Sequence, residues 1–337
     1  MKFQYLNADE ILVDTIIFGQ ENKYGLPALH IAYGIDKNFL LGAGVSISSI
    51  LIHNKKNNYV FHIFIDDIPK EELERFSQLA LIYNTCIKIH TVNCNRLKRL
   101  PTTKNWSIAM YFRFLIGDYF IGSQERVLYL DADIVCQGDI TTLSTLDFEN
   151  KIAAVVTERD KTWWALRAKN LECIGLEQGY FNSGVLLLNT AEWAKEFVSA
   201  KALALLSDNA VISKLTYMDQ DILNMILWDK VKFINGNYNT QFSINYELKE
   251  GFLNPVNENT IFIHYVGPTK PWHSWANYPS TLPFMCAKKL SPWKNTPLMR
   301  PSNSNYARYC AKHNFNQKKF AASIFNYMCY FYFKILK

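Results

Sequence analysis

From Leu29 onward, short apolar segments alternate with longer amphipathic ones, and this alternation limits the folds that the chain can adopt. The short segments are rich in β-branched and aromatic residues and are predicted to be strands, over residues 29–33, 59–65, 87–92, 127–130, 152–156, 184–188, 231–234 and 260–265. The longer segments are predicted to be helices, over residues 44–52, 69–83, 106–121, 190–206 and 218–229. Such alternation is typical of an α/β fold, in which helices flank a mainly parallel sheet.

Length and composition indicate one large α/β domain with additions, or two smaller domains. The chain has 337 residues, of which 49% are hydrophobic, enough to fill a packed core and to exclude a disordered chain. Residues 1–28 are predicted to be a polar N-terminal extension, with an amphipathic piece at 11–18 and a break at 25–27. Residues 29–273 hold the alternating pattern, and residues 274–337 are a basic, aromatic C-terminal region.

The charge of the chain is unevenly distributed. Residues 259–337 contain eleven Lys or Arg and no Asp or Glu, so this part carries a charge of +11, whereas the whole chain carries only +6. Residues 1–258, with 25 basic and 30 acidic side chains, therefore carry −5. A nucleic-acid-binding domain has its basic footprint on the folded body. The acidic body argues against nucleic acid as a partner.

Cysteine usage and hydropathy favour a cytoplasmic protein. Seven cysteines, an odd number, are scattered without a Cys-x-x-Cys pair, which predicts reduced thiols rather than a zinc framework or a disulfide scaffold. No secretory signal is expected at the start, because polar residues follow Lys2. The uncharged run 320–333 would reach about 21 Å as a helix, short of the roughly 30 Å that a bilayer-spanning helix needs.

Two carboxylates, Asp131 and Asp133, directly follow the predicted strand 127–130. Side chains alternate along an extended chain, so positions i and i+2 point the same way. In open α/β sheets, ligands bind in the crevice beyond the carboxyl ends of the strands. Like charges this close repel unless a cation lies between them, and a hard divalent metal that holds a phosphate fits such a pair. The alternative is an ordinary boundary between strand and turn.

A second polar group follows the last predicted strand, in the segment IFIHYVGPTKPWH. The strand delivers His264, the chain turns at Gly267, and Lys270 follows. Imidazole is an acceptable ligand for Mn²⁺ or Mg²⁺ beside carboxylates. A lysine ammonium neutralises a diphosphate as a point charge. For His264 taken alone, a hydrogen-bonded structural histidine is the alternative.

The loop after the first predicted strand, in the segment IAYGIDKNF, offers groups for a nucleoside. Asp36 or Asn38 could bind a ribose hydroxyl or a base edge, and Tyr33 or Phe39 could pack on a base. The chain has no G-x-G-x-x-G and no G-x-x-x-x-G-K-[ST] motif, which argues against Rossmann dinucleotide binding and P-loop chemistry. Turns are commonly rich in Asp and Gly, so a plain turn stays open.

Four more polar residues need an explanation. Arg113 lies in an almost wholly apolar predicted helix, where a guanidinium needs an anionic partner or a path to solvent. Pairing within the fold and phosphate binding are equally open for it. Asp219 and Gln220 stand at the start of helix 218–229, where capping explains one acid but not two acids and an amide. Asn182 precedes a buried strand and could reach a sugar hydroxyl or serve as a turn residue.

Together these segments resemble glycosyltransferase family 8, the retaining, metal-dependent sugar transferases with a GT-A fold. The segments that carry the resemblance, in the family's order, are IAYGIDKNF, SIAMYFRFLIGDYF, RVLYLDADIVCQGDI, GYFNSGVLLLN, MDQDILN and HYVGPTKPWH. They span about residues 29–273, which the resemblance makes the GT-A catalytic domain. LPTTKNW, NTQFSINYELK, KPWHSWANYP and SPWKNTP are similar to the bacterial branch that adds α-1,3-linked galactose or glucose to the lipopolysaccharide outer core.

The resemblance implies a role for each position. Asp131, Asp133 and His264 would bind a divalent metal, Mg²⁺ or Mn²⁺, that bridges the diphosphate of a UDP-sugar. The nucleotide would be contacted by Gly34, Asp36, Asn38, Asp131, Ala132, Asp133, Gly267 and Lys270. The catalytic group would be Arg113, Asn182 and Asp219, which hold the donor sugar, and Gln220, which lies near the anomeric carbon. A donor-sugar acid is expected among Thr157, Glu158 and Asp160, with no choice between them.

The resemblance also implies the reaction. The group near the anomeric carbon is an amide and not a carboxylate nucleophile, so front-side displacement with retention is expected, with a UDP oxygen helping to deprotonate the acceptor. The metal would act as a Lewis acid on the diphosphate leaving group. The acceptor would be a glucose of the lipopolysaccharide core. Galactose is favoured over glucose as the transferred sugar, although a single hydroxyl distinguishes the two donors.

The C-terminal segment 316–337 combines aromatic and aliphatic residues with Lys at both flanks, which is typical of interfacial binding to anionic lipid. We therefore expect a peripheral protein on the cytoplasmic face of the bacterial inner membrane. Deletion of this segment should release the protein from anionic vesicles while preserving UDP-sugar hydrolysis. A C-terminal helix packed on the domain is the alternative.

Three other functions share parts of the pattern. A family-8 transferase that acts on a protein or another glycan would favour a Tyr- or Ser-rich acceptor segment, and the basic aromatic tail argues against it. An inactive nucleotide-sugar-binding protein would lack a ligand or the arginine, whereas every main motif is present. A metal-dependent phosphohydrolase would use paired carboxylates but would not need the HYVGPTKPW segment.

Overall fold

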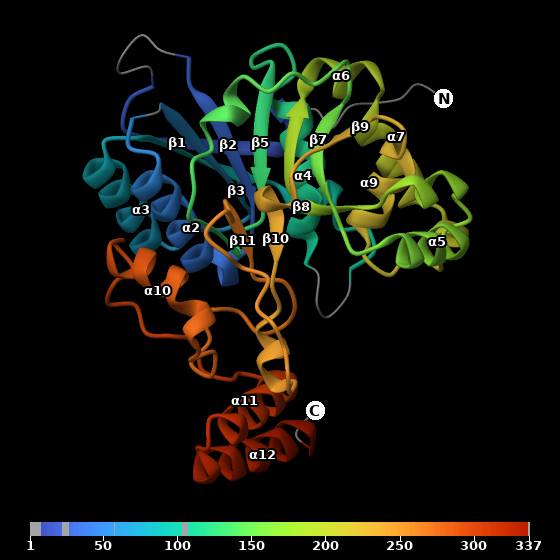
Figure 1. The fold of residues 1–337 in the computed structure, drawn as a ribbon. Helices are drawn as coiled ribbons and strands as arrows, with labels where there is room; N and C mark the ends of the chain where they lie inside the picture. Colours follow the sequence, from blue (N-terminus) through green and yellow to red (C-terminus); the bar gives the residue numbers. More distant parts are fainter. Residues whose placement is uncertain (1–7, 22–26, 57, 103–106, 336–337) are drawn as a thin grey trace.

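The structure, a computed structural model, describes residues 8–21, 27–56, 58–102 and 107–335. It consists of a large body built on a central sheet and a smaller helical projection near the C-terminus (Figure 1). Three predictions fall partly outside the described residues: the first two residues of the break predicted at 25–27, the first residue of the helix predicted over 106–121 and the last two residues of the C-terminal segment.

Eight strands form the central sheet: β1 (Leu12–Phe18), β2 (Leu29–Gly34), β3 (Tyr59–Ile65), β4 (Cys86–Val92), β5 (Arg126–Leu130), β7 (Ala153–Thr157), β8 (Phe181–Asn189) and β9 (Val231–Phe233). Their spatial order is β1-β4-β3-β2-β5-β8-β7-β9. The pairs β4–β3, β3–β2, β2–β5 and β7–β9 are parallel, and β1–β4, β5–β8 and β8–β7 are antiparallel. The predicted α/β class with a mainly parallel sheet is confirmed.

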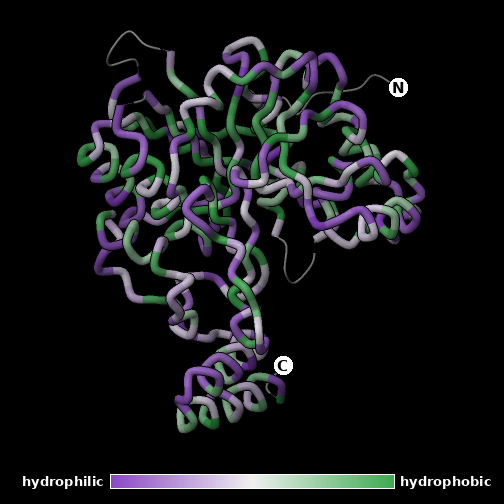
Figure 2. Tube along the Cα trace, in the orientation of Figure 1, coloured by the Kyte–Doolittle hydropathy of each residue, from purple (hydrophilic) through white to green (hydrophobic). Residues whose placement is uncertain are grey.

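Helices cover both faces of this sheet (Figure 1). Those of the body are α1 (Ala8–Ile11), α2 (Leu40–His53), α3 (Lys70–Tyr83), α4 (Phe112–Tyr119), α5 (Lys161–Asn170), α6 (Thr190–Lys195), α7 (Val198–Leu205), α8 (Asn209–Ile212) and α9 (Asp219–Leu227). Successive side chains of a strand point to opposite faces. In β2, Ile31 therefore joins the core with α2 and α3, whereas Ala32 joins the core with α4 and α9. Figure 2 shows the apolar residues concentrated in these central strands.

The edge of the sheet at β1 differs from the prediction. The sequence predicts residues 11–18 only as an amphipathic piece of a polar extension, but β1 pairs antiparallel with β4. Its apolar residues point both to the core, as Ile16 and Phe18 do, and to solvent, as Val13 and Ile17 do. This arrangement hides the alternation on which strand prediction depends.

Two predicted helices are interrupted. The predicted helix 190–206 is divided into α6 and α7 by Phe197, whose φ of +52° lies outside the helical region. The predicted helix 106–121 begins as a 3-10 turn, η3 (Ile108–Tyr111), and continues as α4.

A second sheet of three short strands lies beyond the carboxyl end of β5. Its strands are β6 (Ile134–Cys136), β10 (Thr240–Gln241) and β11 (Phe262–His264). β11 pairs antiparallel with β6 and parallel with β10. The sequence predicts only β11 of the three, because β11 lies within the longer apolar run 260–265, whereas β6 and β10 lie in no apolar run long enough to show a period.

The chain after β11 forms α10 (Leu282–Lys289), which packs against α2. It then forms α11 (Ser304–Asn316) and α12 (Phe320–Ile335), a helical hairpin that projects away from the central sheet (Figure 1). Within the described residues, no helix is both long and apolar enough to cross a membrane.

A row of hydrogen-bonded histidines crosses the sheet. His30 of β2, His62 of β3 and His90 of β4 lie on neighbouring strands and are buried. His30 Nδ1 lies 2.9 Å from His62 Nε2, and His62 Nδ1 lies 3.0 Å from His90 Nε2. The row ends at Thr15 of β1, whose Oγ1 lies 2.9 Å from His90 Nδ1. Burial lowers the pKa of His30 to about 4 and that of His90 to about 3, and holds that of His62 well below 6.5.

These lowered pKa values predict a steep loss of stability in acid. In the unfolded chain the three histidines become protonated near pH 6.5, whereas in the folded protein they stay neutral down to about pH 4. The free energy of unfolding should therefore fall as the pH drops from about 6.5 to 4, by up to roughly 1.4 kcal/mol per pH unit for each histidine. Urea titrations across this range should show a shallower slope for His62→Gln. An unchanged slope would contradict this account. His53→Gln is the comparison: burial also lowers the pKa of His53, but less than that of His62, so this replacement should flatten the slope less.

Candidate functional site

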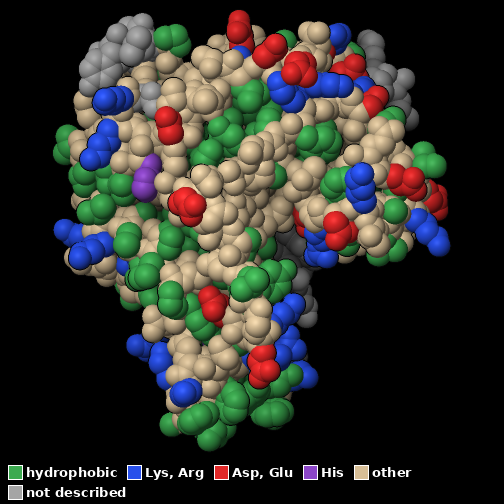
Figure 3. Space-filling view, in the orientation of Figure 1, with side chains coloured by type: hydrophobic (Ala, Val, Ile, Leu, Met, Phe, Trp, Pro, Cys, Tyr) green, Lys and Arg blue, Asp and Glu red, His purple; other side chains and the backbone are tan. Residues whose placement is uncertain are grey.

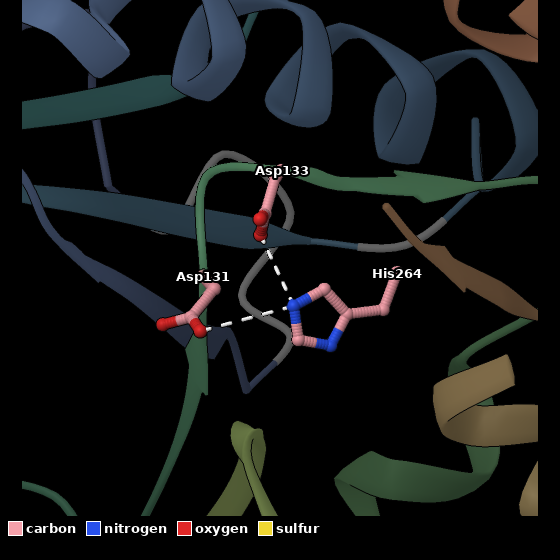
Figure 4. Close-up of side chains that lie close together, drawn as sticks. All are labelled: Asp131, Asp133 and His264. Carbon is pink, nitrogen blue, oxygen red and sulfur yellow. Dashed lines mark ion pairs between the residues drawn. The ribbon is translucent and has the colours of Figure 1, made fainter. Parts of the chain in front are cut away.

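Three predicted ligands meet where β5 and β11 end (Figure 4). Asp131 directly follows β5, and Asp133 directly precedes β6. The antiparallel pairing of β11 with β6 places His264 opposite Ile134, next to both acids. His264 Nε2 lies 3.2 Å from Asp133 Oδ1 and 3.9 Å from Asp131 Oδ2. Two carboxylates and one imidazole thus face a common point, as the sequence predicts.

This set of donors fits a divalent cation. One ligand atom from each of Asp131, Asp133 and His264 can be chosen so that all three lie within 4.8 Å of one another. Asp133 is buried, and its Oδ1 has no hydrogen-bond partner in the described part of the chain. Carboxylate oxygens with one imidazole nitrogen suit Mn²⁺ or Mg²⁺. Among the described residues, no other group of three such side chains is close enough to hold an ion.

Lys270 stands beside the same site. Its Nζ forms an ion pair with Asp133 Oδ2 and donates to the carbonyl oxygen of Tyr265 at 3.0 Å. Burial raises the pKa of Asp133, but Lys270 and His264 together outweigh this effect and hold that pKa well below its usual range. Gly267, with a φ of +89°, turns the chain between His264 and Lys270. Lys270, which is predicted to bind the diphosphate, is therefore a neighbour of the predicted metal ligands.

Arg113 has the anionic partners that its apolar helix requires. The guanidinium is buried and pairs with Asp131 at 3.1 Å and with Asp219 at 2.8 Å. Its Nη2 also donates to Tyr129 Oη at 3.1 Å. Burial lowers the pKa of Arg113, but the surrounding carboxylates outweigh burial, so the group stays charged. Burial raises the pKa of Asp219 to about 6, against the attraction of Arg113.

The first turn of α9 explains why two acids and an amide stand together there. Asp219 forms the ion pair with Arg113. Asp221 is wholly buried and accepts hydrogen bonds from Arg167 and from two backbone N–H groups of the preceding loop, each at 2.7 Å. Gln220, between them, points to a third set of partners. Each of the three side chains therefore has its own partners, and those of Asp221 anchor α9 to the preceding loop.

Gln220 is held by Glu158 and Asn182. Its Nε2 donates to Glu158 Oε2 at 2.7 Å, and its Oε1 accepts from Asn182 Nδ2 at 3.1 Å. Asn182 Nδ2 also donates to Glu158 Oε2 at 3.2 Å. Of the three acid candidates that the sequence leaves open, Glu158 is thus the one buried among the predicted donor-sugar residues. Asp160 caps α5 by accepting from a backbone N–H, and Thr157 ends β7.

The predicted nucleoside loop lies near the same sheet edge, because β2 and β5 are parallel neighbours. Asp36 accepts from the backbone N–H of Asn38 at 2.8 Å and from Ser107 Oγ at 2.7 Å, and Asn38 is exposed. The ring of Phe39 meets Trp272 edge-on, with centroids 5.7 Å apart. The loop therefore borders the segment that carries Lys270.

Tyr33 and the remaining predicted nucleotide contacts have other surroundings. Tyr33 is buried, and its hydroxyl lies 3.0 Å from Ser46 Oγ, so it belongs to the core and is not free to pack on a base. Gly34 packs closely on the start of α4, since a Cβ there would lie 2.8 Å from Phe112 Cβ. Ala132 is buried between the two acids, with its carbonyl oxygen against α2.

Gly184 allows the three candidate metal ligands to approach one another. The pairing of β7 with β8 shifts register next to it, from Val155 opposite Leu186 to Val156 opposite Asn182. A Cβ on Gly184 would lie 2.3 Å from His264 Cε1 and 2.9 Å from Asp131 Oδ2. Its carbonyl oxygen also accepts from the backbone N–H of Asp131 at 2.8 Å. No sequence period indicates this bulge.

Two further site residues are absent from the sequence prediction. Tyr129 donates to Asp131 Oδ1 at 2.7 Å. Because Tyr129 stands two residues before Asp131, the alternation of the strand could have identified it. Asn239 Oδ1 lies 3.0 Å from His264 Nδ1, and no pattern around Asn239 signals this contact.

Comparison with known proteins agrees with this geometry. Residues 30–276 match the family model for glycosyl transferase family 8, and residues 278–334 match the model for glycosyl transferase family 8 C-terminal. The chain is 54% identical to lipopolysaccharide glucosyltransferase WaaO of Escherichia coli strain K12, over 99% of each chain. It is 47% identical to lipopolysaccharide 1,3-galactosyltransferase of Salmonella typhimurium strain LT2, over 98% of each chain.

The fold is similar to that of solved glycosyltransferases. The structure of galactosyltransferase LgtC in complex with donor and acceptor sugar analogs superposes with a TM-score of 0.65, covering 78% of this chain and 96% of that chain at 22% identity. That of glycosyltransferase GlyE from Streptococcus pneumoniae TIGR4 gives a TM-score of 0.56, covering 80% and 62% at 23% identity. These likenesses concern the fold, and they confirm the predicted GT-A type.

Proposed function

Because this chain belongs to glycosyltransferase family 8, we propose that it transfers a hexose from a UDP-sugar to a glucose of the lipopolysaccharide core, with retention and an α-1,3 linkage. The two named lipopolysaccharide relatives differ in the sugar of their names, glucose in one and galactose in the other. One hydroxyl distinguishes these donors, so a single altered hydrogen bond in the pocket can exchange them. Galactose remains the expected sugar, with glucose as the alternative.

One observation carries this proposal. Asp131, Asp133 and His264 form a candidate metal site, and the Asp131 carboxylate pairs with Arg113, which in turn pairs with Asp219 at the start of α9. The groups proposed to bind the diphosphate and the groups proposed to bind the sugar are therefore directly connected. A phosphohydrolase would need the first set but not the second.

The residues of the chain suit this reaction. A divalent metal on the three ligands, Mg²⁺ or Mn²⁺, would supply Lewis-acid charge to the diphosphate leaving group. Lys270 adds a positive charge next to Asp133. Gln220 presents an amide, which is a poor nucleophile, and its amide is held from both ends by Glu158 and Asn182. We assign Glu158 as the donor-sugar acid on this basis.

The experiment that tests the function is release of UDP from UDP-galactose and from UDP-glucose, with Mn²⁺, Mg²⁺ or EDTA, and with truncated lipopolysaccharide core as acceptor. We expect metal-dependent turnover of one donor, stimulated by the acceptor. Tight UDP binding without turnover of either donor would favour the inactive binding protein. Turnover that ignores the core would favour another acceptor. An unchanged donor KM in Glu158→Gln would remove the assignment of Glu158.

We further propose that the hairpin of α11 and α12 binds an anionic lipid surface. The polarity of α12 is inverted relative to a helix of a water-soluble bundle. Ser323 and Asn326 are buried, and Ser323 Oγ donates to the carbonyl oxygen of Ala311 in α11 at 2.9 Å. Most large apolar side chains of α12 are exposed, whereas Phe333 is half-buried and the ring of Phe320 also meets that of Phe315 in α11. A helix packed on the domain by its apolar face, the alternative from the sequence, is not what these contacts support.

The outward face is both apolar and cationic at its borders. The exposed large apolar side chains of α12 are Phe320, Ile324, Phe325, Tyr327, Met328, Phe331, Tyr332 and Ile335. Figure 3 shows apolar side chains gathered at the tip of the projection, with Lys and Arg around them. The neighbouring lysines are Lys312, Lys318, Lys319 and Lys334, and no acidic residue follows Glu258. An anionic bilayer, which on this proposal is the cytoplasmic face of the inner membrane, matches both the rings and the cations.

Replacing the outward face of α12 is expected to release the protein from anionic vesicles. In Ile324→Gln/Met328→Gln/Phe331→Gln, the loss of about 1 kcal/mol per side chain should weaken binding to phosphatidylglycerol vesicles roughly 100-fold. UDP release from the donor should be preserved. This triple variant is a more specific test than deletion of residues 316–337, because α12 still packs against α11. The control is Leu81→Gln/Ile82→Gln, two exposed apolar residues of α3. Vesicle binding by the triple variant with wild-type affinity would contradict the proposal.

A further inference from the structure

A chain of buried amides leads from the backbone to the metal ligand His264. Asn239 ends η6 (Gly236–Asn239), directly before β10, and is buried. Its Oδ1 lies 3.0 Å from His264 Nδ1, and its Nδ2 donates to Asn182 Oδ1 at 2.9 Å. Asn182 Oδ1 also accepts from the backbone N–H of Gly184 at 3.0 Å. His264 itself is buried, so its partners are protein groups.

These contacts determine which nitrogen of His264 carries a proton. A backbone N–H can only donate, so the atom of Asn182 that meets Gly184 is the carbonyl oxygen. The atom of Asn239 that meets this oxygen is then the amide nitrogen. The other end of the Asn239 amide is an oxygen, which can only accept. His264 Nδ1 therefore carries the hydrogen, and in the neutral ring Nε2 holds the lone pair.

The alternative tautomer would change the site. A proton on Nε2 would point toward Asp133 Oδ1, which lies 3.2 Å away and has no hydrogen-bond partner among the described residues. The imidazole would then bridge to the acid and occupy the position that a cation needs. Only the Nδ1–H tautomer presents a lone pair and two carboxylates to the same point (Figure 4).

We infer that Asn239 is a positioning residue that fixes the tautomer and the ring orientation of His264 for metal binding. This inference rests on the proposed metal-dependent function. Partners of this kind typically change metal affinity about 10- to 100-fold when they are removed. Asn182 serves two purposes on this view, because its oxygen orients Asn239 while its nitrogen donates to Glu158 and Gln220. The metal site and the proposed sugar pocket therefore share one set of amide orientations.

The test compares Asn239→Ala and Asn239→Asp with the wild-type protein, without nucleotide or acceptor. Mn²⁺ affinity is measured by electron paramagnetic resonance, and the His264 tautomer by ¹⁵N NMR of metal-free protein at alkaline pH, where imidazoles are neutral. We expect Asn239→Ala to raise the Kd for Mn²⁺ about 10- to 100-fold and to move the proton to Nε2. Asn239→Asp keeps an acceptor for Nδ1–H, so it should retain the wild-type tautomer and bind Mn²⁺ more tightly than the alanine variant.

Three controls separate this inference from the proposed function. Asn237→Ala, in the same turn but outside the amide chain, should leave both readouts unchanged. His264→Gln assigns the NMR signal. Asp133→Ala should lose Mn²⁺ binding, and if it does not, the metal site itself fails whatever Asn239 does. A folded Asn239→Ala protein with wild-type Mn²⁺ affinity and a proton on Nδ1 overturns the inference. If that variant does not fold, a proton on Nε2 in Asn239→Asp overturns it.

Discussion

Asp133→Ala is expected to lower kcat/KM for UDP release on the order of 10³-fold. Lewis-acid stabilisation of a leaving group contributes several kcal/mol, and each 1.36 kcal/mol is tenfold in rate. Asp133 is buried, it faces His264 with Oδ1, and it pairs with Lys270 through Oδ2. The substitution therefore removes a ligand and leaves both neighbouring cationic or basic groups without their carboxylate.

The measurement pairs kinetics with Mn²⁺ binding. Asp139→Ala is the matched control, because Asp139 follows in the same segment but is exposed and bonds to Thr141. It should retain turnover and metal affinity. Asp133→Asn, which keeps the shape of the side chain but not its charge, should resemble Asp133→Ala in activity and, like it, should unfold more easily than the wild type, because Lys270 loses its carboxylate partner. Metal-stimulated turnover at the wild-type rate in either Asp133 variant would contradict the assignment.

Arg113→Met is expected to lower the free energy of unfolding by about 3–5 kcal/mol and to abolish transfer. The guanidinium is buried between Asp131 and Asp219, and its removal leaves Asp219 as a buried carboxylate without a cation. The pKa of Asp219 is already raised to about 6 by burial, although Arg113 opposes the rise. Without Arg113 this pKa should rise further, so any residual UDP release that depends on the Asp219 carboxylate should begin to fall at a higher pH than in the wild type as the pH is lowered.

A double variant separates stability from catalysis here. Arg113→Met/Asp219→Asn removes both charges, so it should recover a large part of the lost unfolding free energy without recovering turnover. Chemical denaturation and UDP release give the two readouts. Arg75→Met is the control for a less buried ion pair, since the half-buried Arg75 pairs with the exposed Glu71 and the half-buried Glu72 on α3, and it should cost clearly less than Arg113→Met. Equal losses for Arg75→Met and Arg113→Met would contradict the buried-pair account.

Part of this site can be predicted from the sequence, because several of its residues follow local patterns. Asp131 and Asp133 follow an apolar strand, where alternation and the sheet edge place them together. Arg113 requires an anionic partner because its helix is apolar. These statements need only neighbouring residues. His264 is different, because it reaches the acids through the pairing of β11 with β6, and only the family resemblance implied that contact.

Other features depend on contacts between distant segments, and local patterns do not report them. Asn239 reaches His264 because β10 pairs with β11, and β10 is too short to show a period. β1 is an edge strand whose apolar residues face both ways. The choice of Glu158 over Thr157 and Asp160 required the positions of α5 and α9 relative to β7.

Gly184 is expected to tolerate substitution as poorly as the side chains of the candidate site, although it has no side chain of its own. It contributes no side chain, yet its N–H orients Asn182, its carbonyl oxygen accepts from Asp131, and its missing Cβ leaves room for the His264 ring. Even alanine must displace a ring atom that would lie 2.3 Å away. In a deep mutational scan, position 184 should therefore be as intolerant as the ligand positions themselves. Variants at position 184 should therefore be grouped with variants of the candidate site and not with variants in an ordinary strand.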